Sequence, residues 1–319
     1  MGKIRKPPKG LRSIPYDLKR RLKKKIIVAK LRHAGRPPFP KLFDIEVTNH
    51  CNLNCVMCPR DTMKRPKGYI DVAFFKEIID QVPPHRLEKS WLHLYGEPLL
   101  HKQLEEMIHY AAETADIEQI GISTNCVVLD EERSLSLLST PLDMLVLSID
   151  GATPETYEKI RREGKFDRVV ANAARFLELK REKGLAHPRV WVQIVEMQDN
   201  AAEIEKFKAD WAPLLGPGDE VFVKNFSAFG GRIEDRSDFY DRMPRTRHPC
   251  SFLWDYFVVC WDGRVTPCCL DMEGELCIGD LTQSSIQEIW DGAEIEAFRE
   301  IHLRSAFSEM PLCENCWGH

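Results

Sequence analysis

This sequence of 319 residues lacks two kinds of segment. No apolar run approaches the about 18 to 20 residues that cross a bilayer, which argues against an integral membrane protein. The start, MGKIRKPPKG, carries charge but has neither an apolar core nor a small-residue cleavage site, so we expect no signal peptide. Hydrophobic content of 43% and charged content of 29% are ordinary for a globular chain. We therefore expect a cytoplasmic globular protein.

Acidic side chains are nearly absent from the first 40 residues. That segment holds 14 Lys or Arg and one acid, Asp17, so its net charge is +13, while the remainder carries −17. Leu18, Leu22, Ile26 and Ala29 recur at helical spacing and predict a basic amphipathic helix. This arm could contact an anionic membrane surface, an acidic partner or nucleic acid, or it could pack on the acidic body of the protein itself.

From residue 42 onward, apolar runs alternate with amphipathic stretches. Six strand and helix units in series predict an α/β fold, a partial (β/α)6 TIM-like barrel, followed by a small C-terminal cysteine-rich domain. We expect a basic extension at 1–41, the barrel at 42–235 and the cysteine-rich domain at 236–319. The expected strands are 42–48, 91–95, 117–124, 143–150, 189–197 and 219–225. In the cysteine-rich domain we expect a hairpin that turns at Asp262-Gly263 and a helix around 285–302.

In a parallel α/β sheet, functional groups lie just after the strands, at their carboxyl ends. Four polar motifs of this sequence stand at such positions: a cysteine triplet after the first strand, GEP after the second, STN at the end of the third and SIDG at the end of the fourth. These motifs should therefore meet at one end of the barrel.

A fourth cysteine is missing from the triplet. Cys51, Cys55 and Cys58 lie within eight residues, and the next cysteine is Cys126. A structural zinc site is closed by four ligands, often from two CxxC-like pairs. A [4Fe–4S] cluster held by three thiolates instead leaves one iron open for another molecule.

The stretch CNLNCVMC resembles the cysteine motif of radical S-adenosylmethionine (radical SAM) enzymes, including the bulky Met57 before the third cysteine. The resemblance implies that the open iron binds the amino and carboxylate groups of S-adenosylmethionine. One electron then cleaves this cofactor to methionine and a 5′-deoxyadenosyl radical, which abstracts a hydrogen atom from the substrate. An electron donor such as flavodoxin or ferredoxin is implied as a partner.

The later motifs resemble the cofactor-contacting segments of the same family. YGEPLL is similar to the GGEP segment that holds the methionine ammonium, with Tyr95 in place of the first glycine; SIDG is similar to the segment that contacts the ribose. Strand-end capping is the plain alternative for Ser148 and Gln193. The cofactor-binding residues implied by the resemblance are Gly96, Glu97, Pro98, Ser148, Asp150 and Gln193.

The tail resembles the short, single-cluster form of the SPASM/Twitch extension, which carries auxiliary [4Fe–4S] clusters. The resemblance implies one auxiliary cluster, with a zinc site on the same thiolates as the structural alternative. Cys260 could replace Cys250, because it lies only ten residues on. The implied auxiliary ligands are Cys250, Cys268, Cys313 and Cys316.

Four cysteines remain outside these two sets. We expect Cys126, Cys260 and Cys277 to be small buried residues. Cys269 directly follows an implied ligand, and related enzymes place a base or a hydrogen-atom donor in this region. Cys269 is therefore a candidate hydrogen donor to a substrate radical, and a core thiol in a CC pair is the alternative.

Three functions fit these observations. The first is a radical SAM oxidoreductase or epimerase acting on a small polar metabolite such as a sugar, aminosugar or cyclitol. The second is a maturase that modifies a peptide or protein, with the basic arm recruiting an acidic leader. The third is a non-enzymatic cluster- or zinc-stabilised protein that binds nucleic acid through the arm. The GEP and SIDG motifs argue against the third, since a structural metal site has no use for them.

Overall fold

The computed structural model describes residues 16–82, 85, 87–234, 236–237, 247–314 and 316, so the first 15 residues of the basic arm lie outside the described residues. The helices are α1 (Tyr16–Ala34), α2 (Val72–Ile79), α3 (Leu104–Thr114), α4 (Glu131–Leu138), α5 (Pro154–Ile160), α6 (Phe166–Glu182), α7 (Ile204–Trp211), α9 (Phe252–Asp255), α10 (Ile286–Trp290), α11 (Ala293–Arg304) and α12 (Pro311–Glu314). The strands are β1 (Leu42–Ile45), β2 (Asn54–Cys55), β3 (Lys89–Trp91), β4 (Ile120–Thr124), β5 (Met144–Ser148), β6 (Arg161–Arg162), β7 (Arg189–Glu196), β8 (Glu220–Asn225), β9 (Tyr256–Val259), β10 (Arg264–Thr266) and β11 (Gly279–Asp280).

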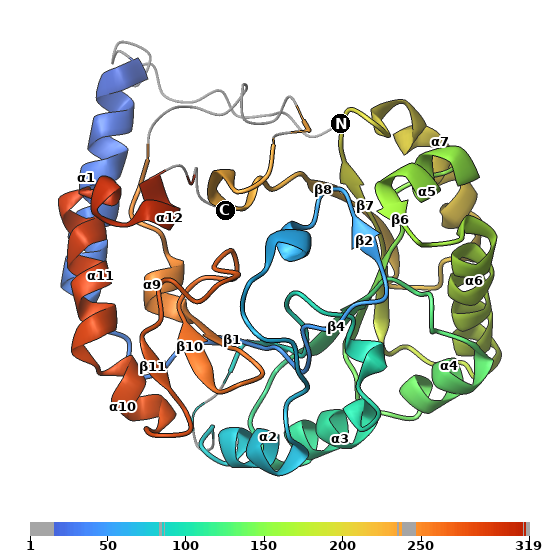
Figure 1. Ribbon diagram of the computed structural model, residues 1–319, viewed down its shortest axis with the longest axis horizontal. Coiled ribbons are helices and arrows are strands. Elements are labelled where there is room, and N and C mark those ends of the chain that lie inside the picture. The colour runs from blue at the N-terminus through green and yellow to red at the C-terminus, as the bar shows by residue number, and fades with distance from the viewer. Residues whose placement is uncertain are drawn as a thin grey trace, which may run out of the picture.

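Nine of these strands form one curved sheet, in the order β11-β10-β9-β1-β3-β4-β5-β7-β8. The run from β1 to β8 is parallel throughout and corresponds to the six predicted strands. The sheet curves around the centre of the molecule, and helices α2 to α7 follow its outer side (Figure 1). The predicted α/β fold with a partial parallel barrel is confirmed.

The cysteine-rich tail continues this sheet. β9 pairs in parallel with β1, on the edge of β1 that β3 leaves open, and β10 and β11 then add as antiparallel strands. The predicted turn at Asp262-Gly263 joins β9 to β10, and Gly263 has a φ of +94°, which favours glycine. The proposed auxiliary domain, 236–319, therefore shares backbone hydrogen bonds with the first strand of the barrel.

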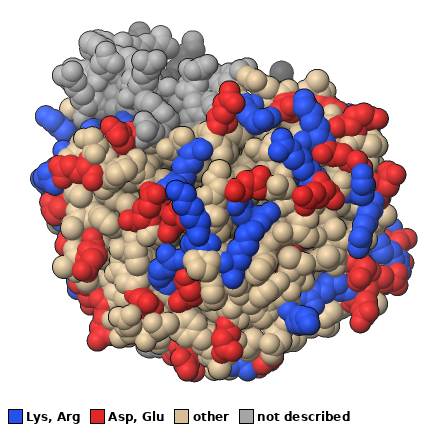
Figure 2. All heavy atoms as spheres, in the orientation of Figure 1, with Lys and Arg blue, Asp and Glu red and all other residues tan. Residues whose placement is uncertain are grey.

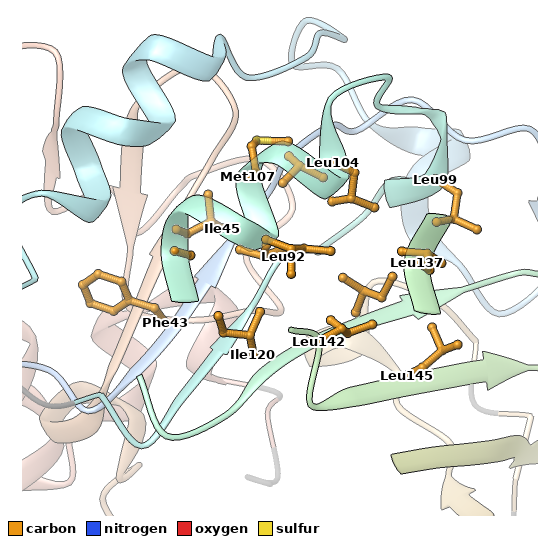
Figure 3. Close-up of a cluster of buried hydrophobic side chains, with 14 of the residues drawn as sticks. Phe43, Ile45, Leu92, Leu99, Leu104, Met107, Ile120, Leu137, Leu142 and Leu145 are labelled. Atoms are coloured by element: carbon orange, nitrogen blue, oxygen red, sulfur yellow. The ribbon is translucent and has the colours of Figure 1, made fainter. Parts of the chain in front are cut away.

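The main hydrophobic core lies between the outer face of the sheet and the helices. Side chains from β1, β4 and β5 pack against α3 and α4, as Figure 3 shows for Phe43, Ile45, Met107, Leu137 and Leu145. At about 25 cal/mol per Å² of buried apolar surface, burial of this layer supplies the main favourable term in folding. The helices are therefore held on the outer face of the sheet, and the carboxyl ends of the strands remain available for functional groups on the inner side.

Two local predictions differ from the structure. The second strand occupies 89–91 instead of 91–95, because the chain after Trp91 turns toward the cysteine loop, where the Glu97 amide donates to the His50 carbonyl at 2.8 Å. The helix expected around 285–302 is two helices, α10 and α11, because Gly292 takes an extended conformation as the N-cap of the second.

The described part of the basic arm packs on the C-terminal region of the same chain. Helix α1 runs beside α11 in Figure 1, and the Lys24 ammonium lies 5.6 Å from the centre of the Phe307 ring. After the helix, the indole of Trp290 donates to the Pro37 carbonyl at 2.9 Å. Leu22 and Ile26 remain exposed on its outer face. None of the described helices is long and apolar enough to span a bilayer.

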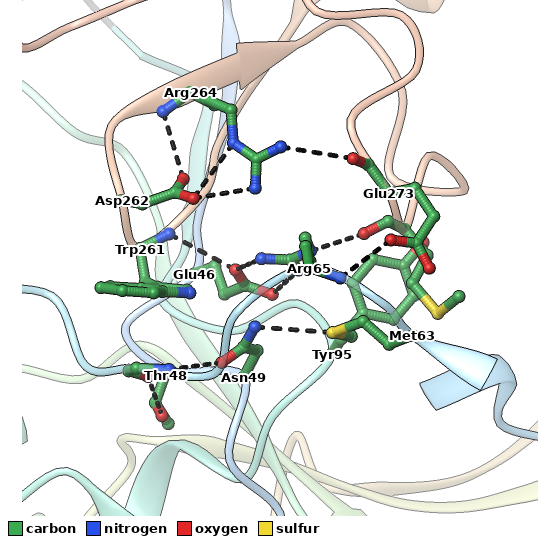
Figure 4. A network of polar contacts seen from close by, with 12 residues as sticks. Glu46, Thr48, Asn49, Met63, Arg65, Tyr95, Trp261, Asp262, Arg264 and Glu273 are labelled. Atoms are coloured by element: carbon green, nitrogen blue, oxygen red, sulfur yellow. Dashed lines mark hydrogen bonds and ion pairs between the residues drawn. The ribbon is translucent and has the colours of Figure 1, made fainter. Parts of the chain in front are cut away.

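A buried ion pair joins the first strand to the tail. The Arg65 guanidinium donates to both carboxylate oxygens of Glu46, at 2.6 and 2.5 Å, and its Nε donates to the Met272 carbonyl at 2.5 Å. The side chains of Arg65 and Glu46 are 2% and 0% exposed. Figure 4 shows Arg65 with Glu46 on one side and with Tyr95 and Glu273 on the other. The cysteine loop, β1 and the tail are thus held together by one guanidinium.

We predict that Arg65→Met lowers the free energy of unfolding by about 3–5 kcal/mol, because it leaves the Glu46 carboxylate buried without its partner. Urea denaturation of the reconstituted protein, followed by circular dichroism, measures this change. The matched control is Arg304→Met, which breaks an exposed bidentate pair with Glu309 and should cost less than about 1 kcal/mol. Equal costs for the two variants would contradict a structural role of the buried pair.

Candidate functional site

The three cysteines of the triplet follow β1 on a loop whose middle is held in place by strand pairing. In that loop, β2 pairs with β6, so that Cys55 lies opposite Arg161. All three thiols are half-buried, and no disulfide links any two of the eleven cysteines of the chain. The side-chain amide of Asn125, at the end of β4, lies 3.7 Å from the Cys51 sulfur. The loop therefore presents three reduced thiols at the carboxyl end of the barrel.

Arg161 supplies positive charge beside these thiols. Burial raises the pKa of the Cys55 thiol to about 12, and the nearby Arg161 guanidinium acts in the opposite direction. Arg161 is itself held by Asp150, whose Oδ2 accepts from its Nε and from its second terminal nitrogen at 2.7 Å each. Metal ligands must be thiolates, so a fixed cation here favours the ligand form. No sequence motif pointed to Arg161.

The predicted cofactor loop lies directly against the cysteine loop at Gly96. A Cβ atom on Gly96 would fall 2.1 Å from the Thr48 carbonyl oxygen and 2.8 Å from that of His50. No side chain fits in that space without moving backbone. The glycine of YGEP is therefore required for the close approach of the two loops that follow β1 and β3.

Glu97 joins this loop to the end of β4. Its carboxylate is 2% exposed, and it accepts from the amides of Leu99 at 3.1 Å and Asn125 at 2.7 Å. Burial raises the pKa of this carboxyl, and these hydrogen bonds lower it. A carboxylate has about four acceptor sites, so Glu97 retains capacity for a further donor such as an ammonium group. Pro98 begins the short helical turn that follows, 98–100.

Ser148 and Gln193, two of the cofactor-binding residues implied by the resemblance, lie opposite each other on neighbouring strands. The Ser148 hydroxyl lies 3.0 Å from the Ser123 hydroxyl and 3.5 Å from Nε2 of Gln193. β5 and β7 pair these two positions in register. Three polar side chains from β4, β5 and β7 thus face one another inside the barrel, next to the Glu97 loop.

Asp150, which the resemblance implies as a cofactor-binding residue, is held by protein groups, and its role toward the cofactor stays a prediction. Besides Arg161, its carboxylate accepts from the Val195 amide at 2.7 Å, and the residue is fully buried. Both of its oxygens are therefore engaged by protein groups. In this geometry Asp150 orients Arg161, because a buried carboxylate is satisfied by the nearest strong donors.

The four implied auxiliary ligands come together although up to 66 residues of chain separate them. Cys250, Cys268, Cys313 and Cys316 all line one cavity of about 310 Å³, together with apolar side chains such as Leu276 and Met310. Ile27 of α1 also lines it. The sulfurs surround a space, and among the described residues no three Cys, His, Asp or Glu side chains close on a single metal ion. The size of the cavity and its four soft donors fit an iron–sulfur cluster.

The remaining cysteines do not line this cavity. Cys260 is buried near Glu46 and Arg65, and Cys126 is buried in the main core. The prediction that Cys277 is buried is wrong, since its thiol is exposed and donates to the Gly279 carbonyl at 3.3 Å. Cys277 lies two residues before the two-residue strand β11 at the edge of the sheet.

Cys269 lies outside the cavity, next to the interior of the barrel. Its thiol is hydrogen-bonded to the Tyr256 phenol, which also donates to the Asp44 carboxylate. Its carbonyl accepts from the Tyr95 phenol at 2.6 Å, so the residue preceding Gly96 contacts the residue following Cys268. Tyr95, the departure from the family pattern, is therefore a direct link between the two candidate sites.

Comparison with known protein families supports both sites. The sequence signature of the "Radical SAM superfamily" matches residues 45–208, which is half of the chain. That of an "Iron-sulfur cluster-binding domain", SPASM, matches residues 250–317. The two signatures imply S-adenosylmethionine and [4Fe–4S] clusters as cofactors. The first covers the cysteine triplet, Glu97 and Ser148, and the second covers all four thiols of the cavity.

The share of each relative that this chain matches differs from one relative to another. The mycofactocin maturase MftC of Mycobacterium tuberculosis is 32% identical over 163 residues, 51% of this chain but only 39% of the maturase. The S-adenosyl-L-methionine-dependent 2-deoxy-scyllo-inosamine dehydrogenase of Niallia circulans is 22% identical over 86% of this chain and 92% of the dehydrogenase. The crystal structure of Streptococcus suis SuiB with its precursor peptide SuiA superimposes with a TM-score of 0.68, at 14% identity over 93% of this chain and 74% of SuiB.

We predict that Cys250→Ser lowers the iron content of the protein, whereas Cys260→Ser, ten residues away, leaves it unchanged. The wild-type protein, reconstituted anaerobically, should bind about eight irons per chain, as two [4Fe–4S] clusters require. Cys250→Ser should lower this to about four, because it removes a ligand that lines the cavity. Cys260→Ser should leave it at about eight. Colorimetric determination of iron and sulfide measures the iron content of both variants. If Cys260→Ser lost iron and Cys250→Ser did not, Cys260 would replace Cys250 as the ligand.

Proposed function

The chain belongs to the radical SAM superfamily, and from that premise we propose that it oxidises or epimerises a small polar metabolite, such as a sugar, aminosugar or cyclitol. It is a radical SAM enzyme with a SPASM-type domain. The substrate class and the reaction subclass are our inference.

We propose that Cys51, Cys55 and Cys58 hold the cluster that binds S-adenosylmethionine, and that Cys250, Cys268, Cys313 and Cys316 hold the auxiliary cluster. When bound, the cofactor and its cluster supply the radical that removes a hydrogen atom from the substrate. Glu97, through a free acceptor site of its carboxylate, takes the ammonium of the cofactor. Ser148 and Gln193 contact its ribose. Arg161, oriented by Asp150, keeps the ligand thiolates charged.

One observation carries the proposal of a small substrate. Along β7, the side chains that face the interior are only partly buried: Trp191 and Gln193 are half-exposed, whereas Val190, Val192 and Ile194 are fully buried. A TIM-type barrel normally fills its interior with packed side chains. These partly exposed side chains on the inner wall support the proposal of a compact substrate between the two cluster sites. The near full-length similarity to an inosamine dehydrogenase is consistent with this class.

A second candidate function is modification of a peptide or protein. It is favoured by the similarity to a mycofactocin maturase and by the superposition on SuiB with its precursor peptide bound. The basic helix α1 would then recruit an acidic leader. An anaerobic screen in deuterated and ordinary water separates the two classes: transfer of hydrogen from a small metabolite into 5′-deoxyadenosine supports the first, and transfer only from peptides replaces it with the second.

We predict that reductant and S-adenosylmethionine release 5′-deoxyadenosine from the reconstituted wild-type protein and none from Cys55→Ala. Loss of one of only three ligands removes the cluster to which the cofactor binds. The matched control is Cys277→Ala, an exposed thiol far from the triplet in sequence, which should behave as the wild type. Chromatography of the quenched reaction measures the product. Release of 5′-deoxyadenosine by Cys55→Ala would rule out the proposed chemistry.

We further propose that Cys269 returns a hydrogen atom to the substrate radical. Its thiol is half-buried beside the barrel interior, and the Tyr256 phenol holds it there. A thiol exchanges its proton with water, so hydrogen delivered from it carries the solvent isotope. The thiyl radical left on Cys269 returns to the thiol by taking one electron from the electron donor and one proton from water. A reaction that ends in this step is an epimerisation, whereas one that ends in loss of an electron is an oxidation.

For this donor role, we predict deuterium at one product carbon when turnover is run in deuterated water. With Cys269→Ala, that incorporation should be lost, and product should form at least about 10²-fold more slowly, within the range seen when a positioned proton donor is removed. Mass spectrometry of the product measures the label. Unchanged turnover of Cys269→Ala would leave Cys269 as a structural thiol.

A further inference from the structure

The open barrel interior carries a cation that none of the functions above uses. Lys224 lies on β8, the last strand of the parallel run, two residues after Phe222, so both side chains leave the same face of the sheet. Phe222 stacks on Trp191 of β7 with ring centres 4.6 Å apart. Because Trp191 faces away from the buried outer layer, Phe222 and Lys224 also face the interior.

Groups on the opposite wall confirm the direction of Lys224. Its ammonium lowers the pKa values of the Asp44 carboxyl on β1, of the His93 imidazole after β3, and of the Cys269 thiol after β10. Only a side chain that reaches into the interior can influence three groups on these elements at once. Lys224 is nevertheless exposed, and among the described residues nothing forms a hydrogen bond or ion pair with it.

Three carboxyl groups near the interior, those of Asp44, Glu46 and Asp150, do not balance this ammonium. Burial raises the pKa of Asp44 to about 7, against the opposing effects of the Tyr256 hydrogen bond and of Lys224, so this carboxyl carries less negative charge at neutral pH than an exposed aspartate. Burial also lowers the pKa of His93 to about 3, which leaves its imidazole uncharged. Glu46 and Asp150 are neutralised by Arg65 and Arg161.

From this arrangement we propose that Lys224 binds an anionic group of the substrate, a carboxylate or a phosphate, while the Trp191–Phe222 pair supports its apolar face. An ion pair inside a partly enclosed barrel is stronger than one at an open surface, because less water screens it. Stacked aromatic rings offer a flat apolar surface beside that charge. Lys and Arg side chains lie near the middle of the face in Figure 2, with Asp and Glu side chains among them.

This inference rests on the proposed function, since it assigns the substrate end of the same site. The inferred negative charge of the substrate also distinguishes this chain from its relative in Niallia circulans, whose name gives an inosamine, an amine, as the substrate. An ammonium group on the ligand would be repelled by Lys224. The sign of the substrate charge is therefore the quantity to measure.

The test is calorimetric titration of the full, reconstituted chain, without reductant, with three matched sugars: D-glucose, D-glucuronate and D-glucose 6-phosphate. At least one anion should bind 10-fold or more tightly than neutral glucose, and the preferred anion distinguishes a carboxylate from a phosphate. Lys224→Gln should abolish the preference, and Lys224→Arg should retain most of it. The control Lys206→Gln, on the outer helix α7, should bind as the wild type.

Two results would overturn the proposal. The first is no preference of the wild type for either anion, including a failure of all three sugars to bind. The second is a Lys224→Gln chain that binds S-adenosylmethionine more weakly by the same factor, since Lys224 would then serve the cofactor. A wild type that releases no 5′-deoxyadenosine overturns the proposed function instead and leaves the titration result as it stands.

Discussion

The structure depends on one buried ion pair, between Glu46 and Arg65. Glu46 directly follows β1, and Arg65 ends the segment that carries the three thiols of the triplet. Arg65 also reaches the carbonyl of Met272, four residues beyond Cys268, so a single guanidinium fixes both ligand segments relative to the first strand. A buried charge must be paired, and the pair can form only when all three segments are in place. The distance between the two cluster sites is set in this way.

Tyr95 adds a second connection at the same place. It lies under Arg65, with the guanidinium 5.9 Å from its ring centre, and it donates to the carbonyl of Cys269. Tyr95, the residue before Gly96, is thus held by the tail, and the tail is held by Tyr95. Together with β9, which pairs with β1, these contacts make the barrel and the proposed auxiliary domain one continuous structure at the substrate side.

Between the two sites lies an interior whose two walls differ. The wall formed by β1, β9 and the segment after β10 presents Asp44, Tyr256 and Cys269, groups that exchange protons and hydrogen. The wall formed by β7 and β8 presents an aromatic pair and Lys224. A substrate held by the second wall would offer its reacting carbon to the first, which gives the proposed thiol donor and the proposed anion site one common geometry.

The sequence by itself determined the fold class, the positions of the motifs after parallel strands and both cysteine sets, because these depend on local periodicity and spacing. It failed at the second strand and at Cys277, where contacts with distant segments decide where a strand ends and whether a side chain is covered. Only the tertiary structure decided that Arg161 faces Cys55, that Asp150 serves that arginine, and that Lys224 points into the interior. Each of these depends on which strands become neighbours and how the sheet curves. A single chain does not encode that curvature in any short motif.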